Sequence, residues 1–378
     1  MTRWNPNSFQ KEGIDKGYNK QYLSRLIEQG HLIDQNNLPV IYSLANLANQ
    51  SNTKYSELHT HVSRAKPANI AYKSFTIKKR SGGKRWISIP CPPLMTVQSW
   101  IAQEILNKLN PHRSAMAYVD GMSNPLKTNA TKHIGSKWLL KLDIINFFNN
   151  ISEKQVYKVF ENAGYPKLLS FEMARLCTRI TPKRKGKRWK QELNSGRWEK
   201  YNCGAVGSLP QGAPTSPALS NLVCKDMDVE LEALTRANLA TYTRYADDLC
   251  FSFFESTRSE IVKFKKKVTD ILWKYQFNEN LDKTRIIPPG KRKILTGVVI
   301  DSGKTTIPKE LRDRIRMHLY YAKKNGIPDH CKHKEFRSVI GFRNHLHGLI
   351  MYVRSINEQQ GNNFLKEFNL LPWLEFEI

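Results

Sequence analysis

The sequence predicts an α+β protein with antiparallel β-hairpins in the middle of the chain and helices at both ends. Residues 138–144 (WLLKLDI) form a short apolar run of β type that ends in a carboxylate. Residues 241–254 hold two further β-type runs on either side of Ala246-Asp247-Asp248, as in a hairpin. From about residue 309 to the end of the chain the sequence favours helices.

Composition limits the classes of function. The chain has 378 residues, 40% of them hydrophobic, enough for one large globular unit or two to three packed subdomains. Lysine and arginine number 60 against 33 acidic residues, and this net charge of +27 favours a polyanionic partner. No apolar run reaches the roughly 18 residues that span a bilayer, and the opening residues lack a hydrophobic signal core. We therefore expect a soluble cytoplasmic protein with no membrane partner.

The remaining elements follow from periodicity and turn residues. Apolar spacing predicts two helices within residues 17–50, and residues 72–89 alternate around Ser81-Gly82-Gly83 as a hairpin does. A strand is expected at residues 294–300 (ILTGVVI). Further helices are expected at residues 95–109, 153–163, 219–234 and 259–275. The six cysteines are scattered without a Cys-x-x-Cys pair, so we interpret them as reduced thiols.

A basic segment interrupts the middle of the chain. Residues 183–200 contain eight basic side chains against two acidic ones, and two tryptophans. Its candidate RNA contacts are Lys183, Arg184, Lys187, Arg188 and Trp189. Cations that meet phosphates and rings that stack on bases suit nucleic acid, while a solvated charged loop is the simpler alternative.

Three aspartates stand at strand ends. Asp143 ends the run at 138–144, and Asp247 and Asp248 lie at the hairpin tip. If these strands are neighbours in one sheet, the carboxylates converge at a solvent-facing edge, where they would suit two Mg²⁺ ions roughly 4 Å apart. Alone, each has a simple alternative, because aspartate is a common turn residue.

Four segments in order closely resemble the palm motifs of bacterial reverse transcriptases: KLDIINFFNNI, LPQGAPTSPALSN, YTRYADDLCFSF and NLDKTRI. GKRWISIP resembles the fingers segment of that family, so the resemblance covers about residues 75–300. It implies a right-hand polymerase with fingers, a palm built on an antiparallel sheet, and a helical thumb. The implied boundaries are N-terminal helices and fingers at 1–135, palm at 136–160, a fingers insertion with the basic loop at 161–205, palm at 206–300, and thumb at 301–378.

The resemblance also implies the roles of the acidic and cationic residues. Asp143, Asp247 and Asp248 would bind two Mg²⁺ ions, and the carbonyl of Ile144 would be a further ligand. Lys283 would supply a cation or, as an acid, a proton near the leaving pyrophosphate. A solvated surface lysine is the alternative for Lys283.

The nucleotide would meet a second set of residues. By resemblance, Arg85 contacts the triphosphate, and Gln211 and Gly212 shape the nucleotide and template pocket. Phe148 would pack under the sugar and reject a ribose 2′-hydroxyl, whereas Phe147 is expected in the core. A core phenylalanine is also the alternative for Phe148.

Within the family, the sequence looks most like the retron type, which copies a structured noncoding RNA into DNA that can stay linked to the RNA. Asn129, Ala130 and His133 match its Asn-Ala-x-x-His element, and Leu295-Thr296-Gly297 stands where Val-Thr-Gly is typical. The resemblance implies RNA contacts at Asn129, His133, Thr296 and Gly297. It also implies an RNA–DNA hybrid product, deoxynucleoside triphosphates as substrates and, by analogy, an effector protein in phage defence.

Two alternatives remain open at this point. An intron-encoded (group II intron-like) or diversity-generating reverse transcriptase would share the catalytic roles and use another template. A polymerase-like scaffold that binds RNA without synthesis belongs to a different class, but it would have no chemical reason to keep all of Asp143, Gln211, Asp247, Asp248 and Lys283.

Overall fold

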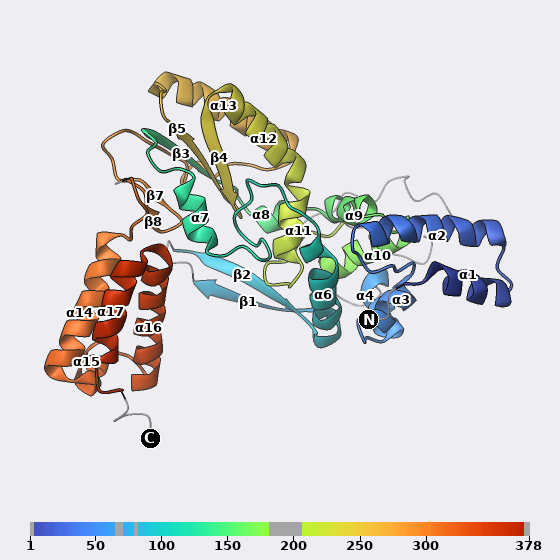
Figure 1. Ribbon diagram of the computed structural model, residues 1–378, viewed down its shortest axis with the longest axis horizontal. Helices are drawn as coiled ribbons and strands as arrows, with labels where there is room; N and C mark the ends of the chain where they lie inside the picture. The colour runs from blue at the N-terminus through green and yellow to red at the C-terminus, as the bar shows by residue number, and fades with distance from the viewer. Residues whose placement is uncertain (1–3, 65–70, 79–81, 181–205, 302, 374–378) are drawn as a thin grey trace. The chain divides into compact units, whose positions relative to one another are not determined.

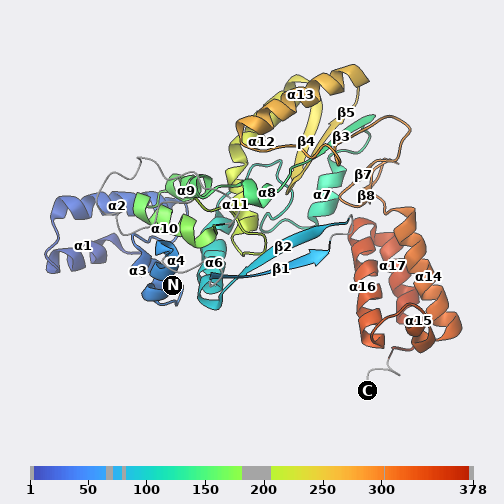
Figure 2. The same cartoon turned by 180° about the vertical axis from the view of Figure 1, so that it is seen from behind.

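The computed structural model describes residues 4–64, 71–78, 82–180, 206–301 and 303–373 (Figures 1 and 2). The chain forms two compact units and passes between them several times. The first comprises Met1–Asp120, Ile144–Val229 and Leu272–Asn278, and the second comprises Gly121–Asp143, Glu230–Ile271 and Glu279–Ile378.

The N-terminal helices of the first unit begin at polar caps. The side chains of Asn5, Asn19 and Ser43 accept hydrogen bonds from backbone N–H groups of the first helical turns, which have no partner within the helix. The two helices predicted within residues 17–50 are confirmed, and one further helix lies on either side of them. The four helices are α1 (Pro6–Asp15), α2 (Lys20–Gln35), α3 (Leu44–Gln50) and α4 (Tyr55–Ser63).

The predicted hairpin is confirmed. Strands β1 (Tyr72–Lys78) and β2 (Lys84–Pro90) pair antiparallel with Lys78 opposite Lys84, and Gly82 and Gly83 in the connection have positive φ. The helices that follow in this unit are α6 (Pro92–Glu104), the 3-10 helix η1 (Leu106–Lys108), α8 (Phe147–Asn150), α9 (Glu153–Asn162), α10 (Lys167–Cys177) and α11 (Ser216–Val223).

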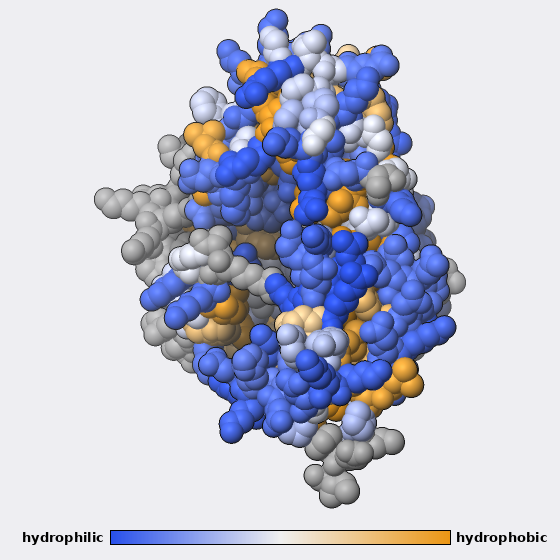
Figure 3. Space-filling model, turned by 90° about the vertical axis from the view of Figure 1, so that its left-hand side faces the viewer, coloured by the Kyte–Doolittle hydropathy of each residue, from blue (hydrophilic) through white to orange (hydrophobic). Residues whose placement is uncertain are grey.

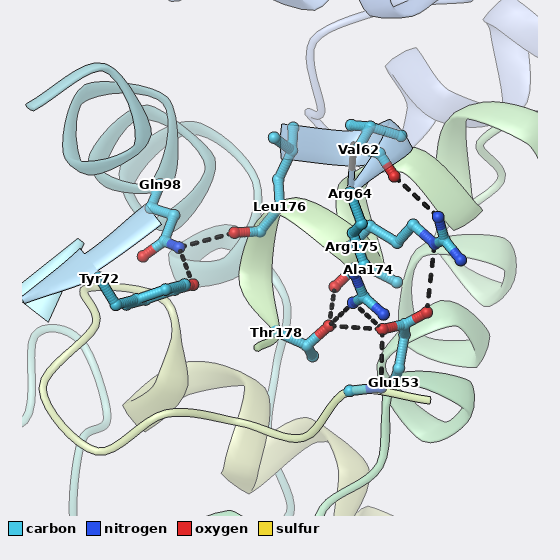
Figure 4. A network of polar contacts seen from close by, with 10 residues as sticks. Val62, Arg64, Tyr72, Gln98, Glu153, Ala174, Arg175, Leu176 and Thr178 are labelled. Atoms are coloured by element: carbon cyan, nitrogen blue, oxygen red, sulfur yellow. Dashed lines mark hydrogen bonds and ion pairs between the residues drawn. The ribbon is translucent and has the colours of Figure 1, made fainter. Parts of the chain in front are cut away.

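A buried ionic network joins α4, α9 and α10 (Figure 4). Glu153 pairs with Arg64 and, at 3.5 Å, with Arg175, while the Thr178 hydroxyl donates to it at 2.9 Å. The backbone N–H of Gly207 donates to the same carboxylate at 3.0 Å. A Cβ at Gly207 would lie 2.7 Å from Glu153 Oε2, so only glycine lets the chain approach this closely.

The second unit is built on a four-stranded antiparallel sheet of order β4-β5-β3-β6. Phe251 and Phe253 on one face contact Phe264 of α13, which runs along the sheet (Figure 1). The strands are β3 (Trp138–Asp143), β4 (Ala240–Tyr245), β5 (Asp248–Phe253) and β6 (Arg285–Ile287), and the associated helices are α7 (Pro125–Thr131), α12 (Lys225–Ala237) and α13 (Arg258–Lys274).

The single strand predicted at residues 294–300 is wrong. The segment forms a tight hairpin in which β7 (Ile294–Leu295) pairs with β8 (Val298–Val299). Thr296 (φ 48°) and Gly297 (φ 87°) both adopt left-handed backbone conformations, as a two-residue hairpin turn requires. The apolar run therefore contains two short strands and a turn at Thr296-Gly297, and not one strand.

The helical C-terminal part is confirmed and has its own apolar core. Helices α14, α16 and α17 pack side by side (Figures 1 and 2) around buried side chains such as Ile315, Phe342 and Phe364. Ala130 of α7 and Val298 of β8 belong to the same core cluster. The helices are α14 (Lys309–Asn325), α15 (Ile327–His333), α16 (Val339–Ile356) and α17 (Glu358–Asn369).

The surface agrees with the composition. The face drawn in Figure 3 is mostly hydrophilic, with scattered hydrophobic residues between the polar ones. Among the described residues, no helix combines the length and apolar character needed to cross a membrane. The five described cysteines are free thiols, as predicted.

The Glu153 network predicts a pH-dependent stability. Burial opposes ionisation of Glu153, but the charges of Arg64 and Arg175 outweigh it and hold the pKa of the carboxyl below its usual range. Glu153→Gln should lower the free energy of unfolding by about 3–5 kcal/mol at pH 7, because the buried Arg175 would lose its ion pair with Glu153. Denaturant unfolding measures the loss.

Glu161→Gln is the matched control, because Glu161 lies on the same helix and pairs with the exposed Lys158. Glu161→Gln should lower the free energy of unfolding by less than about 1 kcal/mol. The folded pKa of Glu153 is the lower one, so its contribution is present above the unfolded value of about 4.3 and is lost as the pH falls through the folded value. Equal losses for the two variants at pH 7 would contradict a stabilising network.

Candidate active site

The sheet register brings Asp143 and Asp248 together. They are directly opposite each other on β3 and β5, and Tyr245 pairs with Asp248 across the hairpin. Side chains of directly opposed residues point to the same face, with Cβ atoms about 4.5–5.5 Å apart. Asp247 lies in the two-residue turn beside them. The predicted neighbourhood of the strands is confirmed, and with it the convergence of Asp143 and Asp248.

The turn that carries Asp247 is held from inside the protein. Ala246 has a φ of 57°, a left-handed conformation that costs a non-glycine residue about 1–2 kcal/mol. The side chain of Arg244, fully buried, donates to the Ala246 carbonyl at 3.3 Å. The buried guanidinium thus helps to keep the strained turn in one conformation.

Asp143 is clamped by the loop that follows α13. The side-chain amide of Asn280 donates to Asp143 Oδ1 at 3.1 Å, and its backbone N–H donates to the Asp143 carbonyl at 2.7 Å. Lys283 Nζ lies 2.6 Å from Oδ2. Asp143 is only 6% exposed, so the expectation that it faces solvent is wrong: these contacts cover it.

The electrostatics show how crowded the carboxylates are. Burial, together with the neighbouring charges of Asp247 and Asp143, raises the pKa of Asp248 to about 6, although Lys141 opposes the rise. The hydrogen bond to Asp143 raises the pKa of Lys283. Lys283 is therefore charged at neutral pH, and Asp248 is mostly ionised there but takes up a proton near pH 6.

A divalent cation suits these acids chemically. Mg²⁺ takes oxygen ligands from proteins, usually one or two carboxylates per ion. Burial and, after it, the charges of Asp247 and Asp143 raise the pKa of Asp248, and a bound cation would oppose both effects. As they stand, no three acidic, histidine or cysteine side chains of the described residues are arranged to hold a metal ion. Lys283 occupies Asp143 Oδ2 and would have to release it to a metal.

The predicted nucleotide residues lie in the first unit. The carbonyl of Gln211 accepts from the N–H of Ser88 on β2 at 2.7 Å, which joins its loop to the hairpin. Gly212 has a φ of 113°, and a Cβ there would meet Ile87 Cγ2 at 2.9 Å. Both features demand glycine. Arg85, on the same strand β2, is exposed.

The two adjacent phenylalanines differ as the sequence suggested. Phe147 is buried and its ring centroid lies 5.7 Å from that of Phe277, so it is a core residue as predicted. Phe148 is half-buried, with its ring 6.3 Å from the ring of the exposed Tyr118. Ile144 is buried directly after Asp143.

Asn129 and His133 are interior residues. The two ring nitrogens of His133 lie 2.8 Å from Ser252 Oγ and 2.7 Å from Thr243 Oγ1, and burial lowers its pKa to about 3. Asn129 is 1% exposed and its amide contacts Thr296 Oγ1 at 3.5 Å. The burial of both side chains contradicts direct RNA contact in this structure. Their polar groups instead contact the sheet and the β7–β8 turn.

Two supporting residues, Arg244 and Asn280, were not predicted from the sequence. Arg244 sits within YTRYADD and Asn280 within NLDKTRI, so both lay inside recognised motifs. An asparagine three residues before Lys283 was the available signal for a second contact to Asp143. The predicted RNA contacts at Lys183, Arg184, Lys187, Arg188 and Trp189 lie outside the described residues.

Comparison with known proteins agrees with this geometry. The sequence profile of the family described as reverse transcriptase (RNA-dependent DNA polymerase) matches residues 77–300. The chain is 27% identical to the retron Ec86 reverse transcriptase of Escherichia coli, over 87% of this chain and 94% of that protein. It is 30% identical to the retron Ec83 reverse transcriptase of the same organism, over 80% and 91%.

A third relative is longer. The chain is 29% identical to the retron Mx162 reverse transcriptase of Myxococcus xanthus over 79% of this chain, and the match spans 61% of that protein's length. A solved telomerase structure from Candida albicans aligns with a TM-score of 0.43 and 11% identity, over 78% of this chain and 56% of that one, a likeness too weak to support a conclusion. The family match covers more than half of the chain, which therefore belongs to the reverse transcriptases, the RNA-dependent DNA polymerases.

Proposed function

We propose that this reverse transcriptase copies a structured noncoding RNA into a short DNA that can stay linked to its template, as the retron resemblance implies. The paired Asp143 and Asp248 beside Asp247 carry the proposal, because an intact acidic edge on a rigid sheet suits synthesis. The retron relatives, one matched over 94% of its length, support the subtype over intron-like or diversity-generating enzymes. A role in phage defence with an effector protein rests on analogy with retrons alone.

Asp143, Asp247 and Asp248 would hold two Mg²⁺ ions, with the carbonyl of Ile144 as a further ligand. When bound, the ions would align the primer hydroxyl with the nucleotide and offset negative charge in the transition state. Because Asp248 has a pKa of about 6, protons compete with metal at this residue in mildly acidic solution. Activity should therefore fall as the pH drops below about 6.

Asn280 and Lys283 would act on Asp143 differently. The Asn280 amide fixes Oδ1 and leaves the other oxygen to be shared, since an amide carries no net charge. The Lys283 ammonium offsets the charge of Oδ2, an oxygen that would be shared with a bound metal ion. Released from Asp143, the lysine would be free to approach the leaving pyrophosphate, and the loss of this hydrogen bond would make it a better acid.

The first unit would supply the nucleotide contacts. Arg85 is exposed on β2, and the loop of Gln211 and Gly212 is hydrogen-bonded to the same strand. We assign Arg85 to the triphosphate, Gln211 and Gly212 to the pocket wall, and the half-buried Phe148 to the sugar. Residues 1–135 and 161–205 would be fingers, 136–160 and 206–300 palm, and 301–378 thumb.

Replacement of a metal ligand should stop synthesis. Asp247→Asn keeps the size of the side chain and removes its charge, so DNA synthesis on poly(rA)–oligo(dT) should fall at least about 100-fold, equivalent to a few kcal/mol of barrier. Asp270→Asn, an exposed aspartate on α13, is the control. RNA binding should be unchanged in both variants. Near-normal synthesis by Asp247→Asn would exclude its role as a ligand.

The clamp on Asp143 predicts a metal-dependent defect. Asn280→Ala removes the hydrogen bond to Oδ1, so synthesis should fall about 10–100-fold and recover in part at high Mg²⁺. Titration of the rate with Mg²⁺ measures the shift. Asn278→Ala, an exposed neighbour, should leave the titration unchanged. An unshifted Mg²⁺ dependence for Asn280→Ala would make Asn280 a merely structural residue.

The sugar contact predicts a change in selectivity. Phe148→Ala should reduce the preference for deoxynucleotides over ribonucleotides by about tenfold, because the ring would exclude the 2′-hydroxyl by volume. The ratio of kcat/KM for dTTP and UTP measures it. Phe147→Leu, in the core, should lower stability without changing that ratio. If selectivity is unchanged in Phe148→Ala, the residue only packs.

A further inference from the structure

A pocket of about 580 Å³ lies in the C-terminal helical part, and no residue of the proposed catalytic site lines it. It falls within the roughly 300–1,000 Å³ of typical ligand sites. Its walls come from α14, α17 and the segment before α14. The lining residues are Lys304, Thr306, Arg312, Arg316, Asn357, Gln359, Gln360, Asn363, Phe364 and Glu367.

Three cationic side chains among the lining residues suit an anion. Lys304, Arg312 and Arg316 face a single carboxylate, that of Glu367. The Nε of Arg312 is buried and has no hydrogen-bond partner, so this donor lacks the acceptor that a buried N–H needs. Arg316 makes a long, exposed contact with Asp313, at 3.9 Å. A phosphate oxygen is the acceptor that a guanidinium binds best.

The remaining lining residues include neutral polar groups. Gln359, Gln360 and Asn363 lie in the first two turns of α17, and each carboxamide presents both donors and an acceptor. Such groups match the edge of a nucleobase, which also mixes donors and acceptors. The buried Phe364 adds an apolar wall beside them.

The surface of α14 continues from the pocket. Arg316 lies one turn before the exposed Tyr320, and Lys324 lies a further turn on, with its Nζ 5.6 Å from the Tyr320 ring centroid. Positions four apart share one face of a helix. Cations and a ring along one face suit a nucleic-acid strand.

We propose that this pocket binds one unpaired nucleotide of the RNA partner, with its phosphate on Arg312 and Arg316 and its base edge on the carboxamides of α17. The proposal rests on the proposed function, in that the chain's partner is taken to be RNA. It adds a recognition site remote from the chemistry. A single extruded nucleotide would let the protein read a folded RNA at a defined bulge or loop.

The experiment compares synthetic RNA hairpins. Four hairpins each carry one bulged nucleotide (A, C, G or U), and the reference is the same hairpin without the bulge. Fluorescence anisotropy with the full chain should show at least one bulged hairpin binding about tenfold more tightly than the paired one. Arg312→Gln and Asn363→Ala should each remove this preference. Arg314→Gln, an exposed arginine of α14 outside the pocket, loses the same charge and should keep it.

The proposal is overturned if the wild-type chain prefers no bulged hairpin, or if Arg312→Gln and Asn363→Ala both retain the preference. Competition by free AMP, CMP, GMP and UMP separates a mononucleotide site from an RNA site. If a free mononucleotide at the same concentration as the bulged hairpin displaces that hairpin completely, the result would also count against RNA recognition. Synthesis on poly(rA)–oligo(dT) should be normal in all three variants, so loss of that activity in the wild type would instead contradict the proposed function.

Discussion

Crowding of negative charge at one edge of the sheet is the constraint on which the rest of the second unit depends. Asp143 and Asp248 oppose each other in the β3–β5 register, with Asp247 in the adjoining turn. Like charges this close disfavour the folded state unless cations or donors offset them, and burial together with the neighbouring charges raises the pKa of Asp248. Lys283 supplies a cation within the chain, 2.6 Å from Asp143 Oδ2.

Buried polar contacts hold this edge in place. Asn280 donates hydrogen bonds to Asp143 from both its side chain and its backbone. Arg244 donates to the turn that carries Asp247. His133 is hydrogen-bonded to two hydroxyls on the face of the sheet that also carries Asp143 and Asp248. A buried polar group is costly without partners, so such contacts specify one arrangement of the strands. The retron-type element that contains His133 is thus, in this structure, part of the support of the sheet.

Strong local patterns explain what was predictable. The hairpins around Gly82-Gly83 and Ala246-Asp247, the strand before Asp143 and the C-terminal helices all follow from periodicity and turn chemistry within short windows. The ordered motifs pointed to Asp143, Asp248 and Lys283, which the structure does bring together. The turn at Thr296-Gly297 was missed, because an apolar run of seven residues does not reveal where it reverses.

The sequence by itself determined most element types, the polyanionic class of partner and the acidic residues at strand ends. Each of these follows from the composition or from the pattern of neighbouring residues. Only the tertiary structure decided that Asn280 grips Asp143 and that His133 is buried against the sheet. It alone assembled the pocket of α14 and α17 from residues up to about sixty positions apart. Burial and long-range contact depend on how distant segments pack, and no local pattern encodes that.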